Sequence, residues 1–154
     1  MKKSNVGLLV LVLMLPVNSA FGVDFSIGGG WPFLVVPEIS GSPLNSDSRL
    51  FTNIKIGQDN GFSAGFERSI GKSKRHALGF VVGSIGIQND DRKCGCFRLL
   101  KDRETTEGYG LTYSYNFSGL NEKGIRLRLE AGQGEGSESK EKRNDGSVIL
   151  SYQF

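Results

Sequence analysis

The chain has 154 residues, which suffices for one domain with a small closed sheet but not for two separate cores. Its 19 basic and 16 acidic residues nearly balance, so there is no general electrostatic attraction to nucleic acid. Glycine is abundant, at 22 residues, and no helical apolar period of useful length follows residue 22, which excludes a helical fold. The composition therefore indicates an all-β protein.

Residues 1–22 predict a secretory signal peptide. Two lysines precede an apolar run over 6–15, a proline ends the run and small residues follow, and the run is too short to span a bilayer as a helix. Cleavage after Ala20 fits the small-x-small rule less well than cleavage after Gly22, so we expect the mature domain to cover 23–154. That domain holds seventeen basic and sixteen acidic residues, a net charge of about +1.

Alternation of apolar and polar residues with a period of two predicts eight strands along the mature chain. The sixth is the cleanest. The second exists only if Pro37 lies at a strand end or a bulge, because proline has no N–H to donate to the sheet. In chain order the expected strands cover residues 23–31, about 33–40, 49–57, 62–70, 76–88, 105–117, 124–134 and 147–154.

The connections between these strands carry turn signals. Asn60-Gly61 predicts a tight hairpin, because this pair accepts the positive φ that both central positions of such a turn require. The remaining connections are a Gly- and Ser-rich loop, a basic turn, a long charged loop, a further turn and a polar loop, expected in that order at residues 41–48, 71–75, 89–104, 118–123 and 135–145.

Alternation alone does not say which row of side chains lies inside. A soluble barrel or sandwich buries its aromatic row, whereas a membrane barrel turns that row toward lipid. The polar rows here are rich in glycine and serine, which suits the narrow interior of an eight-stranded barrel. They also carry charges of both signs, and we expect an ionic network in the lumen from Lys55, Glu67, Arg126, Arg128 and Glu130.

Aromatic residues add a second argument for the membrane arrangement. Interfacial aromatic belts form where strands of a membrane barrel end. We expect such belt positions, near strand ends, at Tyr109, Phe117, Tyr152 and Phe154.

The last strand alternates Val148, Leu150, Tyr152 and Phe154, and the chain stops on this aromatic residue. This pattern resembles the closing strand of Gram-negative outer-membrane β-barrels, and the overall layout is similar to the small OmpA-membrane-domain and OmpX/Ail-like barrels. The resemblance implies an eight-stranded antiparallel up-and-down transmembrane β-barrel in the outer membrane. It also implies that the four alternating residues form a signal for the barrel-assembly machinery, and that outer-membrane lipid and lipopolysaccharide surround the protein.

A periplasmic Phe154 would set the orientation of every connection. The connections near Trp31, at 58–60, at 89–104 and at 135–145 would then face outside. Those at 41–48, 71–75 and 118–123 would be periplasmic. The longer charged loops thus fall on the outside, as in known barrels of this kind.

Cys94 and Cys96 lie in the longest connection, at 89–104. Exported cysteines meet an oxidising environment, so a local disulfide is one expectation, and unpaired or intermolecular thiols are another. A redox or metal role is the third, although two thiolates are too few for a closed zinc site. No cofactor is expected.

The same connection carries a basic patch that could bind anionic sugars or phosphates, made of Arg92, Lys93, Arg98, Lys101 and Arg103. Because the expected lumen is narrow and charged, a general porin is excluded. The leading function is a structural or surface-interaction role through extracellular loops and a surface ligand.

Two other functions stay open. An outer-membrane lipid A modifying hydrolase would need His76, the single histidine, as general base, but no serine and carboxylate pattern accompanies it. Glu104 and Glu107 form only a weak acid/base pair. No catalytic constellation is found, so the protein is not expected to be an enzyme. The second alternative is a soluble secreted β-barrel or β-sandwich binding protein.

Overall fold

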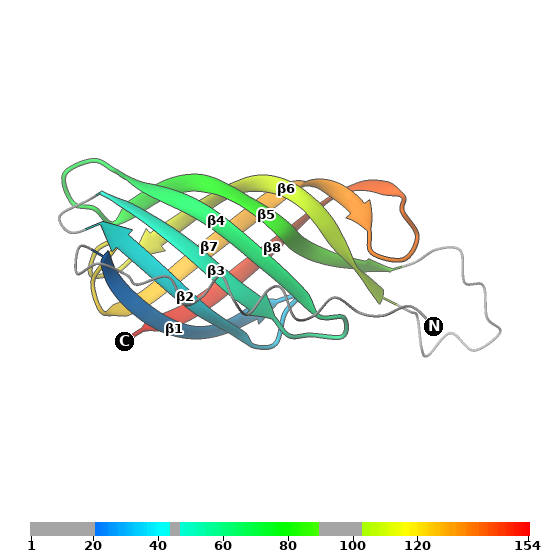
Figure 1. The fold of residues 1–154 in the computed structure, drawn as a ribbon, viewed down its shortest axis with the longest axis horizontal. Helices are drawn as coiled ribbons and strands as arrows, with labels where there is room; N and C mark the ends of the chain where they lie inside the picture. The colour runs from blue at the N-terminus through cyan, green and yellow to red at the C-terminus, as the bar shows by residue number, and fades with distance from the viewer. Residues whose placement is uncertain (1–20, 44–46, 90–102) are drawn as a thin grey trace.

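A computed structural model describes residues 21–43, 47–89 and 103–154. Each strand pairs antiparallel with the next in sequence, and the first pairs with the last, so the sheet closes into an eight-stranded barrel (Figure 1). This confirms the predicted all-β, up-and-down barrel. The strands are β1 (Phe21–Trp31), β2 (Val36–Pro43), β3 (Ser48–Lys55), β4 (Gly61–Ile70), β5 (His76–Asn89), β6 (Arg103–Asn116), β7 (Gly124–Gly136) and β8 (Lys142–Gln153). Among the described residues, no helix is long and apolar enough to cross a membrane.

The connections fall into two groups, one at each end of the barrel. The C-terminal end holds Phe154, the start of β1, the β4–β5 turn and the β6–β7 turn, on the left of Figure 1. The opposite end, called here the far end, holds the β1–β2 connection, the β3–β4 connection and the β7–β8 hairpin, on the right. This grouping follows from the up-and-down order of the strands.

The strands bury their polar rows and expose their apolar rows. Phe80 is 66% exposed and Leu111 is 61% exposed, whereas the side chains of Arg49, Lys55 and Glu67 lie in the interior and are 0% exposed. Because successive side chains on a strand point to opposite faces, the alternation in the sequence becomes an apolar outer wall around a polar filling. A soluble globular protein has the opposite distribution.

The second strand exists, but it begins three residues later than predicted. Phe33 lies ahead of β2 and is fully buried, so its apolar character reflects its position in the mouth of the barrel. Pro37 is the second residue of β2, and the ladder to β3 runs only from Glu38 to Gly41. The proline has no N–H to extend that ladder, which places it at a strand end as expected. The predicted loop at 41–48 is shorter, because β2 continues to Pro43.

The prediction for Asn60-Gly61 was wrong in its turn type. Neither residue is among the described positions with positive φ. β3 ends at Lys55 and β4 begins at Gly61, which leaves a five-residue connection. Asn60 instead accepts a hydrogen bond through Oδ1 from the amide of Gly57, at 3.3 Å. The side chain of asparagine, not its tolerance of a left-handed backbone, shapes this turn.

The polar loop predicted at 135–145 was also wrong, since most of it belongs to strands. β7 runs to Gly136 and β8 begins at Lys142. Tyr109 was expected near a strand end, yet it lies well inside β6. Both errors have the same physical reason. The outward side chains of β6 change from apolar to polar between Tyr109 and Glu107, which looks like a strand end in the sequence, but the strands continue beyond this point.

A β-bulge explains why the rows of the fifth strand were difficult to separate in the sequence. The register of β5 against β6 shifts between Ser84 and Gly86. Before the bulge the outward side chains of Leu78, Phe80 and Val82 are exposed, whereas residues 84–87 at the bulge are all buried. An extra residue in one strand disrupts the ladder locally, and here the alternation of exposed and buried residues is lost at that point.

Candidate functional site

The interior of the barrel contains a set of charged side chains, called here the interior ionic cluster. All of its members face inward, and each is at most 3% exposed. They come from β2, β3, β4 and β7 and are Glu38, Arg49, Lys55, Glu67, Arg126, Arg128 and Glu130.

Arg128 lies at the centre of this cluster. Its Nη1 donates to Glu38 at 2.5 Å and its Nε donates to Glu67 at 3.0 Å. Its guanidinium carbon is 3.8 Å from the ring centroid of Phe51, a cation–π contact. One side chain of β7 therefore joins β2, β3 and β4 across the lumen.

Both carboxylates bound by Arg128 have further donors. Glu38 also accepts from Arg126 at 2.7 Å and from Asn53 at 3.1 Å. Glu67 accepts from Arg49 and, at 3.0 Å, from Thr112. Every carboxylate oxygen of these two glutamates is hydrogen-bonded, which is the condition under which buried charge is tolerated.

The structure places the five residues predicted for a lumen network inside the barrel. It joins Glu67 to Arg128 and Lys55 to Glu130, and Arg126 reaches this network through Glu38. Sequence reasoning missed Glu38 and Arg49. The signal was present, because both residues lie within the predicted second and third strands and Arg49 shares the inward parity of Lys55.

Two apolar side chains obstruct the interior, one at each end. At the far end Phe33 packs with Val36, Ile87 and Ile149, and the Nζ of Lys55 is 5.3 Å from its ring centroid. At the C-terminal end Leu120 is almost fully buried. The backbone carbonyl of Leu120 accepts from Nη1 of Arg49 at 2.9 Å. The lumen is a packed polar core with apolar ends.

At the far end a second polar cluster forms around Glu104. Its carboxylate accepts from the amides of Glu138 and Ser139, at 2.9 and 2.8 Å, and from Arg143 at 2.7 Å. The pairing of Glu104 with Glu107 suggested by the sequence was wrong, because Glu104 is buried and Glu107 is exposed on the outer wall. Glu104 instead holds the β7–β8 hairpin over the mouth.

Asp59 ties the β3–β4 connection to the same region. Its carboxylate accepts from the amide of Thr105 at 2.7 Å, from the hydroxyl of Ser137 at 3.3 Å and from the amide of Asn60 at 2.9 Å. Burial alone would raise the pKa of Asp59, but these donors outweigh it and hold the pKa below its usual 3.8.

This depressed pKa predicts an acid-sensitive contact. Because the folded pKa of Asp59 lies below the unfolded value, its contribution to stability is present above the unfolded value and is lost as pH falls through the folded value. Hydrogen exchange should show the amide of Thr105 losing protection in that range. The Asp59→Asn variant should show no such pH dependence. The amide of Gly30, which donates to Phe33 at 2.8 Å, is the control. Equal pH profiles in both proteins would refute the assignment.

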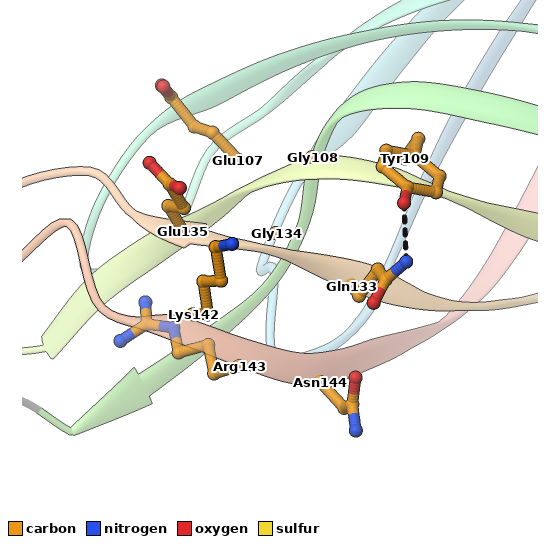
Figure 2. Close-up of a pocket in the computed structure, with 9 residues that line it drawn as sticks. All are labelled: Glu107, Gly108, Tyr109, Gln133, Gly134, Glu135, Lys142, Arg143 and Asn144. Carbon is orange, nitrogen blue, oxygen red and sulfur yellow. Dashed lines mark hydrogen bonds between the residues drawn. The ribbon is translucent and has the colours of Figure 1, made fainter.

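The outer wall carries a polar hollow of about 600 Å³ at the far end of β6, β7 and β8 (Figure 2). Two rows of outward side chains face it. One row is Tyr109, Gln133 and Asn144, and the other is Glu107, Glu135 and Lys142. Gln133 donates to the hydroxyl of Tyr109, the dashed line in Figure 2. Gly108, Gly134 and Arg143 complete the lining.

The C-terminal residues predicted as an assembly signal all lie on the outer wall, namely Val148, Leu150, Tyr152 and Phe154. The amide of Phe154 donates to the carbonyl of Phe25 at 2.9 Å, and the two rings stack with centroids 6.0 Å apart. The chain end is thus fixed against β1.

Of the predicted basic patch, only Arg103 falls within the described ranges, as the exposed first residue of β6. The other predicted residues of that connection lie outside them: Arg92, Lys93, Arg98 and Lys101, and the two cysteines Cys94 and Cys96.

His76 lies at the C-terminal end of the barrel, and its Nδ1 is 2.8 Å from the hydroxyl of Tyr113. In the part of the chain that the structure describes, neither a serine hydroxyl nor a carboxylate is hydrogen-bonded to it. Within those ranges, no group of three or more His, Cys, Asp or Glu side chains could hold a metal ion. The geometry defines a closed, filled eight-stranded barrel. No family model, curated protein or solved structure matches the chain.

Proposed function

We propose that this protein is an outer-membrane β-barrel of a Gram-negative cell, with a structural or surface-interaction role through its outer connections. The observation that carries the proposal is the exposed apolar wall around a charged interior. Phe80, Leu111 and Leu150 are each more than half exposed, and residues of the same kind surround the barrel. Soluble monomers rarely expose contiguous apolar surface on this scale. In a bilayer, the acyl chains of lipids would cover that apolar surface.

The direction of the buried charges supports the same arrangement. A basic residue facing lipid at the midplane costs about 2–4 kcal/mol. Arg126 and Arg128 avoid that cost by pointing inward, where Glu38 and Glu67 bind them. Because the interior is packed and both ends are obstructed, the proposed role is not that of a general porin.

In the proposed orientation the C-terminal end is periplasmic and the far end is outside. Residues 1–22 act as the signal peptide, and the assembly machinery recognises the strand that ends in Phe154. Lipopolysaccharide surrounds the far end. The predicted basic patch, whose described member Arg103 is the exposed first residue of β6, is then available to anionic sugars or phosphates on the outside.

Membrane fractionation and gel electrophoresis test the proposal. We expect the protein in the detergent-insoluble outer-membrane fraction, with different mobility before and after boiling. A Phe80→Arg variant should lose about 2–4 kcal/mol of stability in lipid, because Phe80 lies in the middle of the apolar wall. Phe117→Arg is the matched control. It lies just after β6, where the same change costs about 0–1 kcal/mol.

The contrary result is a protein that is soluble without detergent and shows no heat-dependent mobility. Phe80→Arg and Phe117→Arg would then have similar, small effects, since both side chains would face water. That combination would favour a soluble secreted barrel and reject the membrane assignment.

A further inference from the structure

Two hollows adjoin on the outer wall of β6 and β7. The first is the polar hollow at the far end. The second, called here the apolar furrow, has a volume of about 160 Å³ and is lined by Leu78, Leu111, Tyr113, Leu129 and Ala131. Thr112 and Glu130, whose side chains are buried in the interior, also border it. Alkyl and aromatic groups make up nearly all of the furrow's lining, whereas the polar hollow combines amide, carboxylate and amino groups with apolar surface.

The linings of the two hollows are neighbours along the strands. Tyr109 and Gln133 pair across β6 and β7 at the edge of the polar hollow, and Leu111 and Ala131 pair at the edge of the furrow. These pairs are two residues apart on each strand, a rise of about 7 Å. Ala131 also pairs with Gly146, so the wall carries two small residues side by side where the polar hollow meets the furrow.

The polar hollow has the chemistry that recognises sugar hydroxyls. Glu107 lies opposite Glu135 in the register, and Lys142 lies on the other side of Glu135. Among the described residues no ion pair engages any of these three charges. Carboxylates and amide oxygens accept hydrogen bonds from hydroxyl groups, and ammonium and amide N–H groups donate to them. Tyr109 adds an aromatic surface beside Gln133 and Asn144.

We propose that the polar hollow and the apolar furrow together bind one glycolipid molecule. The sugar headgroup occupies the polar hollow and an acyl chain lies in the furrow. The inference rests on the proposed function, because only in a bilayer would a lipid lie against the barrel wall with its headgroup toward the far end and its acyl chain along the strands. The polar hollow lies at the far-end edge of the apolar wall, at the level where headgroups of the outer leaflet would lie.

Native mass spectrometry of the purified protein, in a detergent without a sugar headgroup, tests the proposal. The probe is diglucosyl diacylglycerol, and phosphatidylglycerol with the same acyl chains is the comparison. We expect one bound glycolipid per protein, with phosphatidylglycerol failing to displace it. Removing both carboxylates, in Glu107→Ala with Glu135→Ala, should weaken binding about tenfold or more, because hydrogen bonds to charged groups are lost.

A second variant, Ala131→Phe, fills the furrow and should also weaken binding. Its matched control is Ala64→Phe, the same change at an outward position of β4. Glu122→Ala, in the β6–β7 turn, controls for loss of a surface carboxylate. Equal retention of both lipids, or equal losses in variants and controls, would overturn the glycolipid site. Heat-dependent mobility is scored on the same samples, so failure of the membrane assignment is recognised separately.

Discussion

Replacing Arg128 with methionine should destabilise the barrel by about 3–5 kcal/mol, the cost of removing one partner from a buried ionic network. Arg128 is the one side chain that binds both Glu38 and Glu67 among the described residues. Without it, two buried carboxylates lose a donor each and their mutual repulsion rises. Methionine is unbranched and of similar length to arginine, so the loss of stability would come more from the missing charge than from missing volume.

Urea unfolding in lipid vesicles measures this prediction. The fluorescence of the single tryptophan, Trp31, and the heat-dependent gel band both follow the folded barrel. Arg68→Met is the matched control, since Arg68 is exposed on the outer wall near a turn. Its stability should be unchanged or slightly higher. Similar losses in Arg128→Met and Arg68→Met would contradict a central role for the interior ionic cluster.

A second variant, Arg126→Met, tests whether the loss of stability depends on how many partners the arginine has. Arg126 bonds Glu38 and Ser26 through one nitrogen only, while its Nε and Nη1 are buried and have no protein partner. Removing it should therefore cost less than removing Arg128. Adding Glu67→Gln to Arg128→Met should recover part of the loss, because one of the two unpaired carboxylates is neutralised. A double variant as unstable as the single variant would show that lost packing, not charge, sets the cost.

Local alternation predicted much of this fold. The sixth strand was expected at 105–117 and is observed at Arg103–Asn116, and the seventh begins at Gly124 as expected. Side chains on a strand alternate whatever lies around them, so the inward parity of Arg126 and Arg128 was visible in the sequence. The strand count and closed order follow from the same signal.

Contacts between distant segments could not be predicted in this way. Glu38 meets Arg128 across 90 positions, and Arg49 meets Leu120 across 71. Neither contact has a local pattern, because both depend on how the closed barrel places opposite walls. Phe33 was assigned to a strand because an apolar residue in a connection resembles a strand residue until the mouth that it fills is known. The extra residue at the β5 bulge likewise has no signature in a single sequence.

Gly30→Ala should prevent the barrel from closing. Gly30 lies in β1 opposite Ile149 of β8, in the six-residue ladder that joins the two ends of the sheet. A Cβ at this position would lie 1.9 Å from the carbonyl oxygen of Val148 and 2.9 Å from its carbonyl carbon. Backbone atoms cannot rotate away as a side chain can, so β1 and β8 must separate. Each backbone group then left unpaired away from water costs about 1–3 kcal/mol.

The expected result is loss of the fast-migrating unheated band and faster proteolysis, because an open barrel exposes two strand edges. Gly57→Ala is the control. A Cβ there lies 3.3 Å from Cδ1 of Ile87, a flexible side-chain end that can shift, and Gly57 does not have positive φ. It should fold and migrate as the parent does. An unchanged band for Gly30→Ala would contradict the prediction, because it would mean that the barrel closes without the close approach of β1 to β8 at this position. Closure would then rest on the remaining pairs and on the contact of Phe154 with Phe25.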